Sequence, residues 1–348
     1  MACQNAGRRR GAPFMSAFRY PRPLICDPST PGALPLAGGW AFFAQVELLS
    51  RSEPARVIAA TDLPEKVLDR LTRTRVPQAG LQFDAPKIMG ILNVTPDSFS
   101  DGGLFQDHAA ALTQIRAMAK ADILDIGGES TRPSAAEVEI AEEIARTAPV
   151  IEAIAAETDT PISIDTRKAR VAQAAVDAGA KMINDVSGLD FDAEMAGMMA
   201  KAGMPVCLMH AQGTPETMQA DPRYENVLLD VFDALEARRD RAVAAGVALK
   251  DVMLDPGIGF GKTLAHNLQL VQGLSLFHAL GCPLLLGVSR KGFIGKLGDA
   301  PNPADRMPGS VALGLVGATQ GVQVLRVHDV EETAQAFALW SAVSGDKT

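Results

Sequence analysis

Eight short apolar runs, each followed by a segment of helical character, are the strongest constraint that this sequence places on its fold. Each run is rich in Ile, Val, Leu and Met and too short for a helix, which is typical of strands buried on both faces. The segments between them are rich in Ala and end near glycines that suit helix C-termini. The runs span residues 88–94, 122–128, 161–166, 181–188, 205–210, 251–257, 283–289 and 322–329.

Strands that alternate regularly with helices predict an α/β fold with a parallel sheet. Either a (β/α)8 barrel or a large doubly wound sheet fits the pattern, but a count of eight favours the barrel. No GxGxxG segment opens the first unit, so a dinucleotide-binding sheet has little support. We therefore predict a (β/α)8 TIM barrel over residues 81–348, preceded by an N-terminal extension over residues 1–80.

The extension has a different composition from the barrel. About the first 20 residues contain an Arg run and no periodicity, and we expect them to be disordered. Further on, residues 40–50 (WAFFAQVELLS) suit a strand, and residues 63–73 (LPEKVLDRLTR) suit a short amphipathic helix. The residues of the extension indicate no function.

Charge and cysteine usage exclude several classes of partner. A formal net charge of −8 argues against binding along a nucleic-acid backbone, which requires a basic face. No segment approaches the ~18 consecutive apolar residues of a membrane span. The four cysteines form no CxxC pair and no metal-ligand spacing, so we expect no disulfide framework and a cytoplasmic location.

Polar side chains recur where the apolar runs end. In a barrel these carboxyl ends meet at one rim, which is where barrel enzymes hold their active sites. A single Asp at such a position could be structural, but repetition at eight strand ends predicts a site. The residues are Asn93, Asp125, Asp165, Asn184, Asp185, His210, Asp255, Ser289, Arg290, Lys291, Arg326 and His328.

The residue types at the rim suit two kinds of ligand. Buried carboxylate and amide groups, as at Asp165, Asn184 and Asp255, can read the edge of a planar heterocycle. Basic groups, as at Arg326 and His328, suit a phosphate or carboxylate, and Arg132 belongs with them.

Asn93 and Asp101 offer oxygen ligands for a hard cation such as Mg²⁺. The alternative for Asp101 is a turn cap within its own loop, and the residues leave both interpretations open.

Eight segments closely resemble motifs of the dihydropteroate synthase family, in that family's order, over about residues 86–345. They are NVTPDSFSDGG (93–103), DIGGESTRP (125–133), SIDTRK (163–168), INDVSG (183–188), MHAQGTPETMQ (209–219), LDPGIGFGKT (254–263), LGVSRKGFIG (286–295) and RVHDV (326–330). The resemblance implies a TIM-barrel transferase of folate biosynthesis. Its substrates would be p-aminobenzoate and 6-hydroxymethyl-7,8-dihydropterin pyrophosphate, its products 7,8-dihydropteroate and pyrophosphate. It also implies Mg²⁺, inhibition by sulfonamides and a homodimer.

The resemblance assigns roles by matching motif positions. It places the pterin among Asp125, Asp165, Asn184, Met209, Asp255, Phe260, Gly287 and Lys291. It places pyrophosphate at Asn93, Arg326 and His328, and the metal at Asn93 and Asp101. It assigns p-aminobenzoate to Phe99, Thr131, Arg132, Pro133 and Ser289.

The family mechanism, in its dissociative form, needs no nucleophilic side chain. Pyrophosphate leaves first, and the pterin carries the positive charge until the amine attacks. The catalytic side chains implied are Asp165, Lys291, Arg326 and His328, which would stabilise the ring cation or the departing anion.

Two positions depart from the family pattern. Ser134 replaces a glycine that many members have, and Gly292 replaces a serine that can contact the p-aminobenzoate carboxylate. Two alternatives stay open: a methyltetrahydrofolate-binding domain of a corrinoid methyltransferase, which shares the Asp/Asn pterin pocket, and a non-catalytic pterin-binding paralogue, which these two departures would suit. The first has no reason to carry RVHDV or the NVTPDSFSDGG and ESTRP loops. Pyrophosphate release that depends on both substrates would separate a synthase from the second.

Overall fold

The structure is a computed structural model that describes residues 17–94, 104–130, 137–213 and 217–344, without the side chains of 104–110. Eight parallel strands form one sheet in the order β10-β9-β8-β7-β6-β5-β12-β11. A parallel bridge between Leu254 and Leu284 joins its two edges, so the sheet closes. The strands are β5 (Lys87–Asn93), β6 (Ile123–Gly127), β7 (Ile162–Asp165), β8 (Met182–Asp185), β9 (Val206–Met209), β10 (Val252–Asp255), β11 (Leu285–Leu286) and β12 (Val324–Val327).

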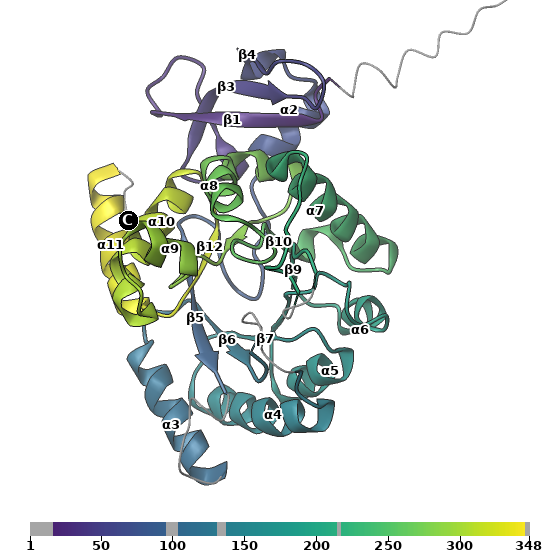
Figure 1. Cartoon of the computed structure of the whole chain (residues 1–348), viewed down its shortest axis with the longest axis vertical. Helices are drawn as coiled ribbons and strands as arrows, with labels where there is room; N and C mark the ends of the chain where they lie inside the picture. The colour runs from purple at the N-terminus through teal and green to yellow at the C-terminus, as the bar shows by residue number, and fades with distance from the viewer. Residues whose placement is uncertain (1–16, 95–103, 131–136, 214–216, 345–348) are drawn as a thin grey trace, which may run out of the picture.

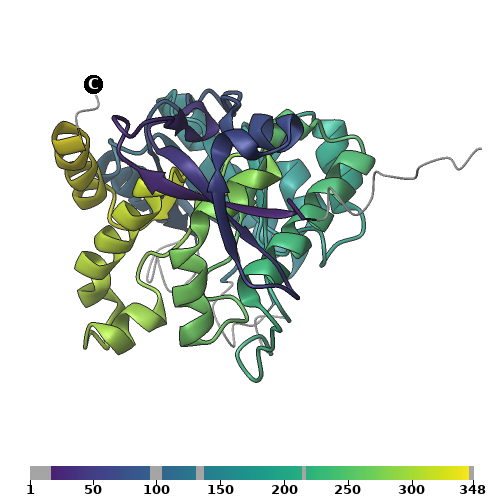
Figure 2. The same cartoon turned by 90° about the horizontal axis from the view of Figure 1, so that it is seen from above.

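Helices follow the strands and surround the barrel (Figures 1 and 2). Their ends follow local chemistry: Gly203 closes α6 in the left-handed conformation (φ 62°), and Thr263 begins α8 with a capping box. The predicted (β/α)8 barrel and its eight strands are therefore confirmed. The helices are α3 (Leu104–Ala117), α4 (Ile140–Glu157), α5 (Ala169–Ala178), α6 (Met195–Ala202), α7 (Val227–Ala244), α8 (Leu264–Gln272), α9 (Gly292–Leu297), α10 (Met307–Thr319) and α11 (Val330–Ser344).

The barrel interior contains an apolar layer near the strand starts, to which every strand except β7 contributes one residue. Leu81 and Phe83, from the segment before β5, pack into the same cluster and close that end of the barrel. The layer consists of Met89, Ile123, Met182, Cys207, Met253, Leu285 and Val324, all at most 1% exposed. Because side chains alternate along a strand, residues two positions further on face the interior again, closer to the carboxyl rim.

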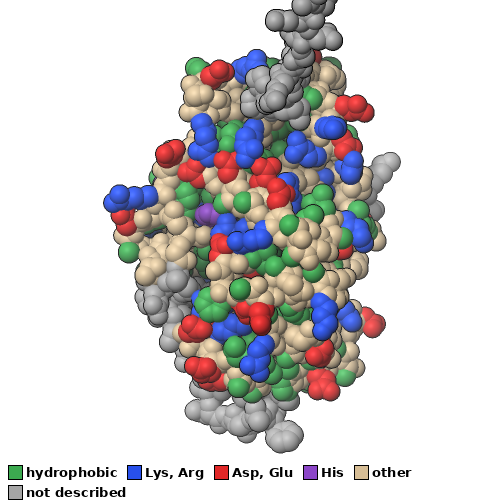
Figure 3. Space-filling model, turned by 90° about the vertical axis from the view of Figure 1, so that its right-hand side faces the viewer, with side chains coloured by type: hydrophobic (Ala, Val, Ile, Leu, Met, Phe, Trp, Pro, Cys, Tyr) green, Lys and Arg blue, Asp and Glu red, His purple; other side chains and the backbone are tan. Residues whose placement is uncertain are grey.

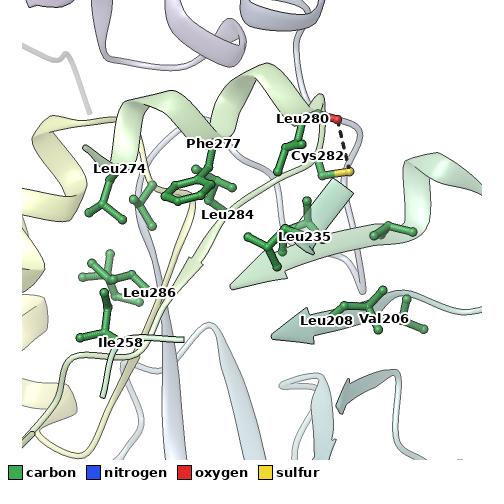
Figure 4. Packing of buried hydrophobic residues seen from close by; sticks show 14 of the residues in the cluster. Val206, Leu208, Leu235, Ile258, Leu274, Phe277, Leu280, Cys282, Leu284 and Leu286 are labelled. Carbon is green, nitrogen blue, oxygen red and sulfur yellow. Dashed lines mark hydrogen bonds between the residues drawn. The ribbon is translucent and has the colours of Figure 1, made fainter. Parts of the chain in front are cut away.

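The outer faces of the strands pack against the helices in a larger core. Figure 4 shows part of it, where Phe277 of the 3₁₀ helix η5 (Leu274–Leu280) lies against Leu284. Ile258 and Leu286 pack beside each other in the same view, close to the rim. This apolar shell holds the strand ends in fixed register, and the site depends on that register.

The N-terminal extension forms a small antiparallel sheet beside the barrel (Figure 1). Its strand over residues 42–49 and its helix over residues 65–72 confirm the two elements predicted there. The expected disorder of about the first 20 residues concerns mainly residues 1–16, which lie outside the described ranges. The elements are β1 (Tyr20–Cys26), β2 (Leu34–Pro35), β3 (Phe42–Leu49), β4 (Arg56–Ala59) and α2 (Glu65–Thr72).

Tyr20 connects the extension to α7. Its ring is 6% exposed and lies edge-on to Phe232, with ring centroids 5.4 Å apart. Its hydroxyl donates to Asp233 (2.9 Å), which also accepts from Arg19 and Arg51. Figure 3 shows the mixture of basic and acidic side chains on this side of the molecule. The extension is thus packed onto the barrel through an apolar contact ringed by ion pairs.

We expect Tyr20→Ala to lower the free energy of unfolding of the whole chain by about 3 to 5 kcal/mol, because it removes a buried aromatic side chain. Tyr20→Phe is the matched control: it keeps the ring and loses only the hydroxyl, with its hydrogen bonds to Asp233, Arg19 and Arg51, which costs about 1 to 3 kcal/mol. Thermal and urea unfolding measure both. An extension that unfolds independently would instead give a separate early transition, with the main transition unchanged in Tyr20→Ala.

No helix in the described part of the chain is long and apolar enough to cross a membrane.

Candidate active site

The inward-facing residues two positions beyond the apolar layer form a polar layer near the rim. In the order of the chain they are Asp125, Asn184, Met209, Asp255, Gly287 and Arg326. Each follows a member of the apolar layer by two residues, so one alternation along the strands produces both layers. Five of the six are residues that the resemblance assigned to the pterin, and the fold brings them together.

Arg326 links Asp125 of this layer to Asp165, which is opposite Asn184 in the strand register and is counted with the polar layer from here on. Its Nε donates to Asp125 Oδ2 (2.6 Å) and its Nη2 donates to Asp165 Oδ2 (2.7 Å). Asn184 Nδ2 donates to the same oxygen of Asp125 (3.2 Å). Asp125 is fully buried and Asp165 is 7% exposed. The arrangement joins the predicted pterin and pyrophosphate residues through hydrogen bonds, although Asp125 and Arg326 are 201 residues apart.

Burial and charge act against each other at these groups. Burial raises the pKa of Asp165, and the Arg326 guanidinium only partly offsets that rise. Burial opposes the charge of Arg326 as well, but Asp125 and Asp165 hold its pKa above the ordinary arginine value. Asp165 therefore binds a proton more readily than a surface carboxylate does, and it depends on nearby positive charge to stay ionised.

Two carboxylate oxygens in this layer are buried without a hydrogen-bond donor among the described residues. They are Asp125 Oδ1 and Asp165 Oδ1, and Ser163 Oγ nearby is also buried without a partner there. Buried polar atoms in native proteins almost always have partners. A ligand that presents ring N–H groups to the layer would supply donors for both carboxylates.

Asp255, the last residue of β10, is a third carboxylate in the polar layer. It is 5% exposed, and Oδ1 accepts from the backbone N–H of Gly257 (2.7 Å). Burial raises its pKa to about 6, while Gly257, Lys291, Lys262 and Arg326 act to lower it. A Cβ on Gly287 would lie 3.9 Å from Oδ2, so the glycine leaves space directly beside this carboxylate.

The loop after β11 supplies Ser289 and Lys291. Lys291 Nζ lies 4.0 Å from the centre of the Phe260 ring, a cation–π contact between two predicted pterin residues. Ser289 Oγ accepts from the backbone N–H of His328 (3.1 Å) and lies 2.9 Å from Nδ1 of the same residue. The two contacts hold the His328 ring against Ser289, and which partner donates between Oγ and Nδ1 depends on the imidazole tautomer.

Strand register aligns a second row of residues across the rim. Asn93 is opposite Gly127, Gly127 is opposite Asp165, and Asp165 is opposite Asn184. A Cβ on Gly127 would lie 3.7 Å from Asp165 Oδ2 and 3.8 Å from Asn93 Oδ1. The glycine thus leaves a space lined by two oxygen atoms, which fits a hard cation with few protein ligands. In the described ranges, no group of three or more His, Cys, Asp or Glu forms a metal cluster.

Five predicted site residues lie outside the described residues: Phe99, Asp101, Thr131, Arg132 and Pro133. The assignment of p-aminobenzoate to these loops and of the metal to Asp101 remains a prediction.

A buried ion network beside the site was not predicted. Lys168 Nζ donates to Glu129 (3.1 Å) and Glu143 (2.7 Å), and Arg167 Nε donates to Glu129 (2.9 Å). Glu129 also accepts from the backbone N–H of Val138 (2.9 Å), and Lys168 donates to the carbonyl of that residue. The network holds residues 129 and 138 at fixed positions. SIDTRK contains both cations, but the sequence does not show which carboxylates they reach.

Arg290 has an unusual backbone conformation, with φ of 56°. Its guanidinium pairs with Asp329, its N–H donates to Ser310 (2.8 Å), and its carbonyl accepts from Arg306 (3.1 Å). These contacts hold a conformation that is costly for a residue with a Cβ. They fix the direction of Ser289 and Lys291 on either side of it.

These features define a (β/α)8 barrel whose carboxyl rim holds buried carboxylate acceptors beside basic side chains, the arrangement of a barrel enzyme. The family model described as pterin binding enzyme matches residues 89–328. Dihydropteroate synthase of Escherichia coli K12 is 45% identical over 269 residues, which cover 77% of this chain and 95% of that protein. The chain therefore belongs to the dihydropteroate synthase family, and it is a transferase.

Solved structures agree with this assignment. A Yersinia pestis dihydropteroate synthase in complex with a sulfonamide drug has a TM-score of 0.73 and 46% identity, covering 78% of this chain and all of that chain. A Xanthomonas albilineans dihydropteroate synthase in complex with 7,8-dihydropteroate has a TM-score of 0.69 and 42% identity, covering 77% and 97%. The predicted family, fold and activity class are confirmed.

Proposed function

We propose that the rim joins p-aminobenzoate to 6-hydroxymethyl-7,8-dihydropterin pyrophosphate with the residue roles given below. The observation that carries the proposal is the pair of buried carboxylates, Asp165 and Asp255, each with an acceptor oxygen facing the barrel interior near a cation. A pterin presents ring N–H donors along one edge, and buried acceptors in this arrangement would read that edge.

The carboxylates also support the chemical step. When the C–O bond to pyrophosphate breaks, both electrons leave with the anion and the ring gains positive charge. Asp165 and Asp255 would then hold the ring N–H groups more strongly than in the ground state, which lowers the barrier. The amine nitrogen of p-aminobenzoate forms the new C–N bond and releases a proton to water or to the departing anion.

Arg326 and His328 are placed to receive the departing anion. Arg326 uses Nε and Nη2 on carboxylates, and Nη1 has no partner among the described residues. The Ser289 contact orients the His328 ring, and with Ser289 donating to Nδ1 the imidazole would offer an Nε2 proton to the anion. Asn93 Oδ1, beside the space above Gly127, would hold Mg²⁺ together with phosphate oxygens. When bound, the metal neutralises charge on the leaving pyrophosphate.

The test is a coupled-substrate assay with the purified full chain. We expect pyrophosphate release only when Mg²⁺ and both substrates are present, and we expect a sulfonamide to compete with p-aminobenzoate. Absence of p-aminobenzoate-dependent release at saturating pterin would favour the non-catalytic paralogue. Inhibition that does not depend on p-aminobenzoate concentration would contradict the placement of that substrate.

We expect Gly292→Ser to lower the KM for p-aminobenzoate by roughly two- to tenfold, with kcat nearly unchanged. The substitution restores the hydroxyl that related enzymes place there, and one added hydrogen bond to a carboxylate has about this effect. A Cβ at position 292 would meet nothing within 4 Å, so the serine fits. Gly292→Ala is the matched control and should match the wild type in steady-state kinetics. Equal effects of Ser and Ala would refute a role for the hydroxyl.

Assembly and location are further parts of the proposal. A homodimer is supported by apolar side chains exposed on two neighbouring helices, Val316 of α10 and Leu339 and Val343 of α11. Light scattering that gives a single-chain mass of 36.7 kDa at micromolar concentration would contradict it. A cytoplasmic location is supported by cysteines without disulfide partners at Cys26, Cys207 and Cys282.

A further inference from the structure

Lys262 is a buried cation that the proposed reaction does not use. Its side chain follows the glycine-rich turn after β10 and is 3% exposed. Nζ lies 3.0 Å from His210 Nδ1 and donates to the carbonyls of His210 (3.3 Å) and Phe260 (2.9 Å). An ammonium group has three donors, and here it meets three acceptors.

The geometry allows two protonation states of the pair. Burial lowers the pKa of Lys262, and burial together with Lys262 lowers the pKa of His210. Both groups cannot be charged at this separation. One state is an ammonium at Lys262 that donates to a neutral His210 and to both carbonyls; the other is a neutral amine that donates to the carbonyls and accepts from His210 Nδ1–H. The Asp255 carboxylate favours the ammonium, the state on which the positioning role below depends.

Lys262 connects two walls of the pterin site. His210 follows Met209, the apolar member of the polar layer at the end of β9. Phe260 lies in the turn after β10, and its ring carries Lys291 at 4.0 Å. One buried side chain therefore fixes the distance between Met209 on one strand end and the Phe260–Lys291 pair on the next.

The turn over residues 257–262 depends on this link because it lies very close to neighbouring backbone. A Cβ on Gly257 would lie 1.9 Å from the His210 carbonyl oxygen, and one on Gly261 would lie 2.4 Å from that of Gln212. Both glycines have positive φ (66° and 62°). Such a turn has little intrinsic preference for one conformation, so side-chain hydrogen bonds select it. Lys262 contributes from the buried side, while Asn267 and Tyr224 hold Gly259 and Gly261.

Lys262 also acts on Asp255 through its charge, because the two lie on either side of Gly257: the Gly257 N–H donates to Asp255 Oδ1, and the glycine packs on the His210 carbonyl that Lys262 Nζ reaches. The charged groups that act on Asp255 are Lys291, Lys262 and Arg326, together with the Gly257 N–H. Those that act on Lys262 are Asp255, Arg238 and Lys291. Asp255 is the one anion in that second set, so the two buried charges favour each other's ionised forms.

We propose that Lys262 is a positioning residue for pterin binding: its ammonium fixes the Met209 and Phe260 walls and keeps Asp255 ionised without touching the substrate. This inference rests on the proposed function, because it assumes that the pterin edge is read by the Asp255 carboxylate. It makes two separable statements, one about charge and one about position.

The test measures the Kd of 6-hydroxymethyl-7,8-dihydropterin pyrophosphate for the full chain by calorimetry, in the presence of Mg²⁺. The pH is varied on both sides of the pKa of Asp255, which burial raises to about 6. Wild-type affinity should fall as the pH drops through this value, because protonated Asp255 no longer accepts a ring N–H. Lys262→Met removes the positive charge that favours ionised Asp255. The midpoint of its affinity–pH curve should therefore move upward by roughly one pH unit. At neutral pH its Kd should weaken by about tenfold.

Lys262→Arg separates charge from position. Its guanidinium keeps the charge but does not fit three convergent acceptors, so the affinity should fall while the midpoint stays at the wild-type value. Lys201→Met, on the exposed side of α6, is the matched control and should reproduce wild-type binding at every pH. If Lys262→Met does not fold in a thermal melt, Lys262→Gln replaces it, since it keeps two donors without charge.

The outcomes are distinct. A wild-type midpoint and Kd in the neutral variant would overturn the inference, and so would equal midpoint shifts in Lys262→Arg and the neutral variant. A wild type that binds no pterin pyrophosphate at any pH would count against the proposed function instead.

Discussion

Asp165→Asn is expected to abolish detectable binding of the pterin pyrophosphate and to lower kcat/KM by about a thousandfold or more. Asn has the same shape but replaces one acceptor oxygen with a donor. Arg326 Nη2 already requires an acceptor on one side of the group, at 2.7 Å, so the amide would present its N–H groups to the ligand. Losing a buried, charge-assisted hydrogen bond and creating a donor–donor contact together cost about 4 kcal/mol.

Asp185→Asn is a matched control for this substitution. Asp185 is the last residue of the neighbouring strand β8 and is fully buried, but it accepts from Ser187 and Leu189 within its own loop. It should lower the melting temperature and weaken pterin binding much less than Asp165→Asn does. Calorimetry measures the affinity of both variants for the pterin pyrophosphate, and circular dichroism confirms that both are folded. Unchanged affinity in Asp165→Asn would place the pterin away from the end of β7.

Much of this site could be predicted because it depends on local alternation. A strand that has an inward Met182 must have an inward Asn184, and the same holds for Met253 and Asp255. The apolar runs therefore locate the strands, and the polar residue two positions past an inward apolar one locates the site. This second step could have been taken from the sequence alone, and it would have assigned Arg326 to the same layer as Asp125 and Asp255, without showing which side chains it contacts.

The contacts between distant segments could not be predicted in this way. Nothing local indicates that Arg326 reaches Asp125 and Asp165, because the contact depends on barrel closure, which places β12 beside β5. The same is true of Lys262 and His210, which are 52 residues apart. Packing of the extension on α7 also depends on shape complementarity around Tyr20 and Phe232, which no periodicity encodes. Side-chain pairing across elements is thus where the structure adds most.

Arg326→Gln is expected to reduce turnover as strongly as Asp165→Asn, for a different reason. Without the guanidinium, Asp125 and Asp165 are left buried with no cation paired to either of them among the described residues. Removing one partner from a buried ion pair costs about 3 to 5 kcal/mol, and the pKa of Asp165, already raised by burial, should rise further. Asp165 would then be protonated at neutral pH and would no longer accept a ring N–H. Arg326→Lys keeps the charge, but it lacks the fork that spans two carboxylates, so its activity should recover only in part.

Arg326→Gln also separates the two roles that Arg326 can have. One role is to keep the carboxylates ionised, and the other is to contact the pyrophosphate. The comparison is between 6-hydroxymethyl-7,8-dihydropterin, which lacks the anion, and its pyrophosphate. If Arg326 acts only by keeping Asp165 ionised, Arg326→Gln weakens both ligands by the same factor. We expect a loss about tenfold larger for the pyrophosphate, because Nη1 has no partner among the described residues and one direct contact to an anion has about this effect. Equal losses would remove Arg326 from the pyrophosphate site and leave that anion to Asn93, His328 and the metal.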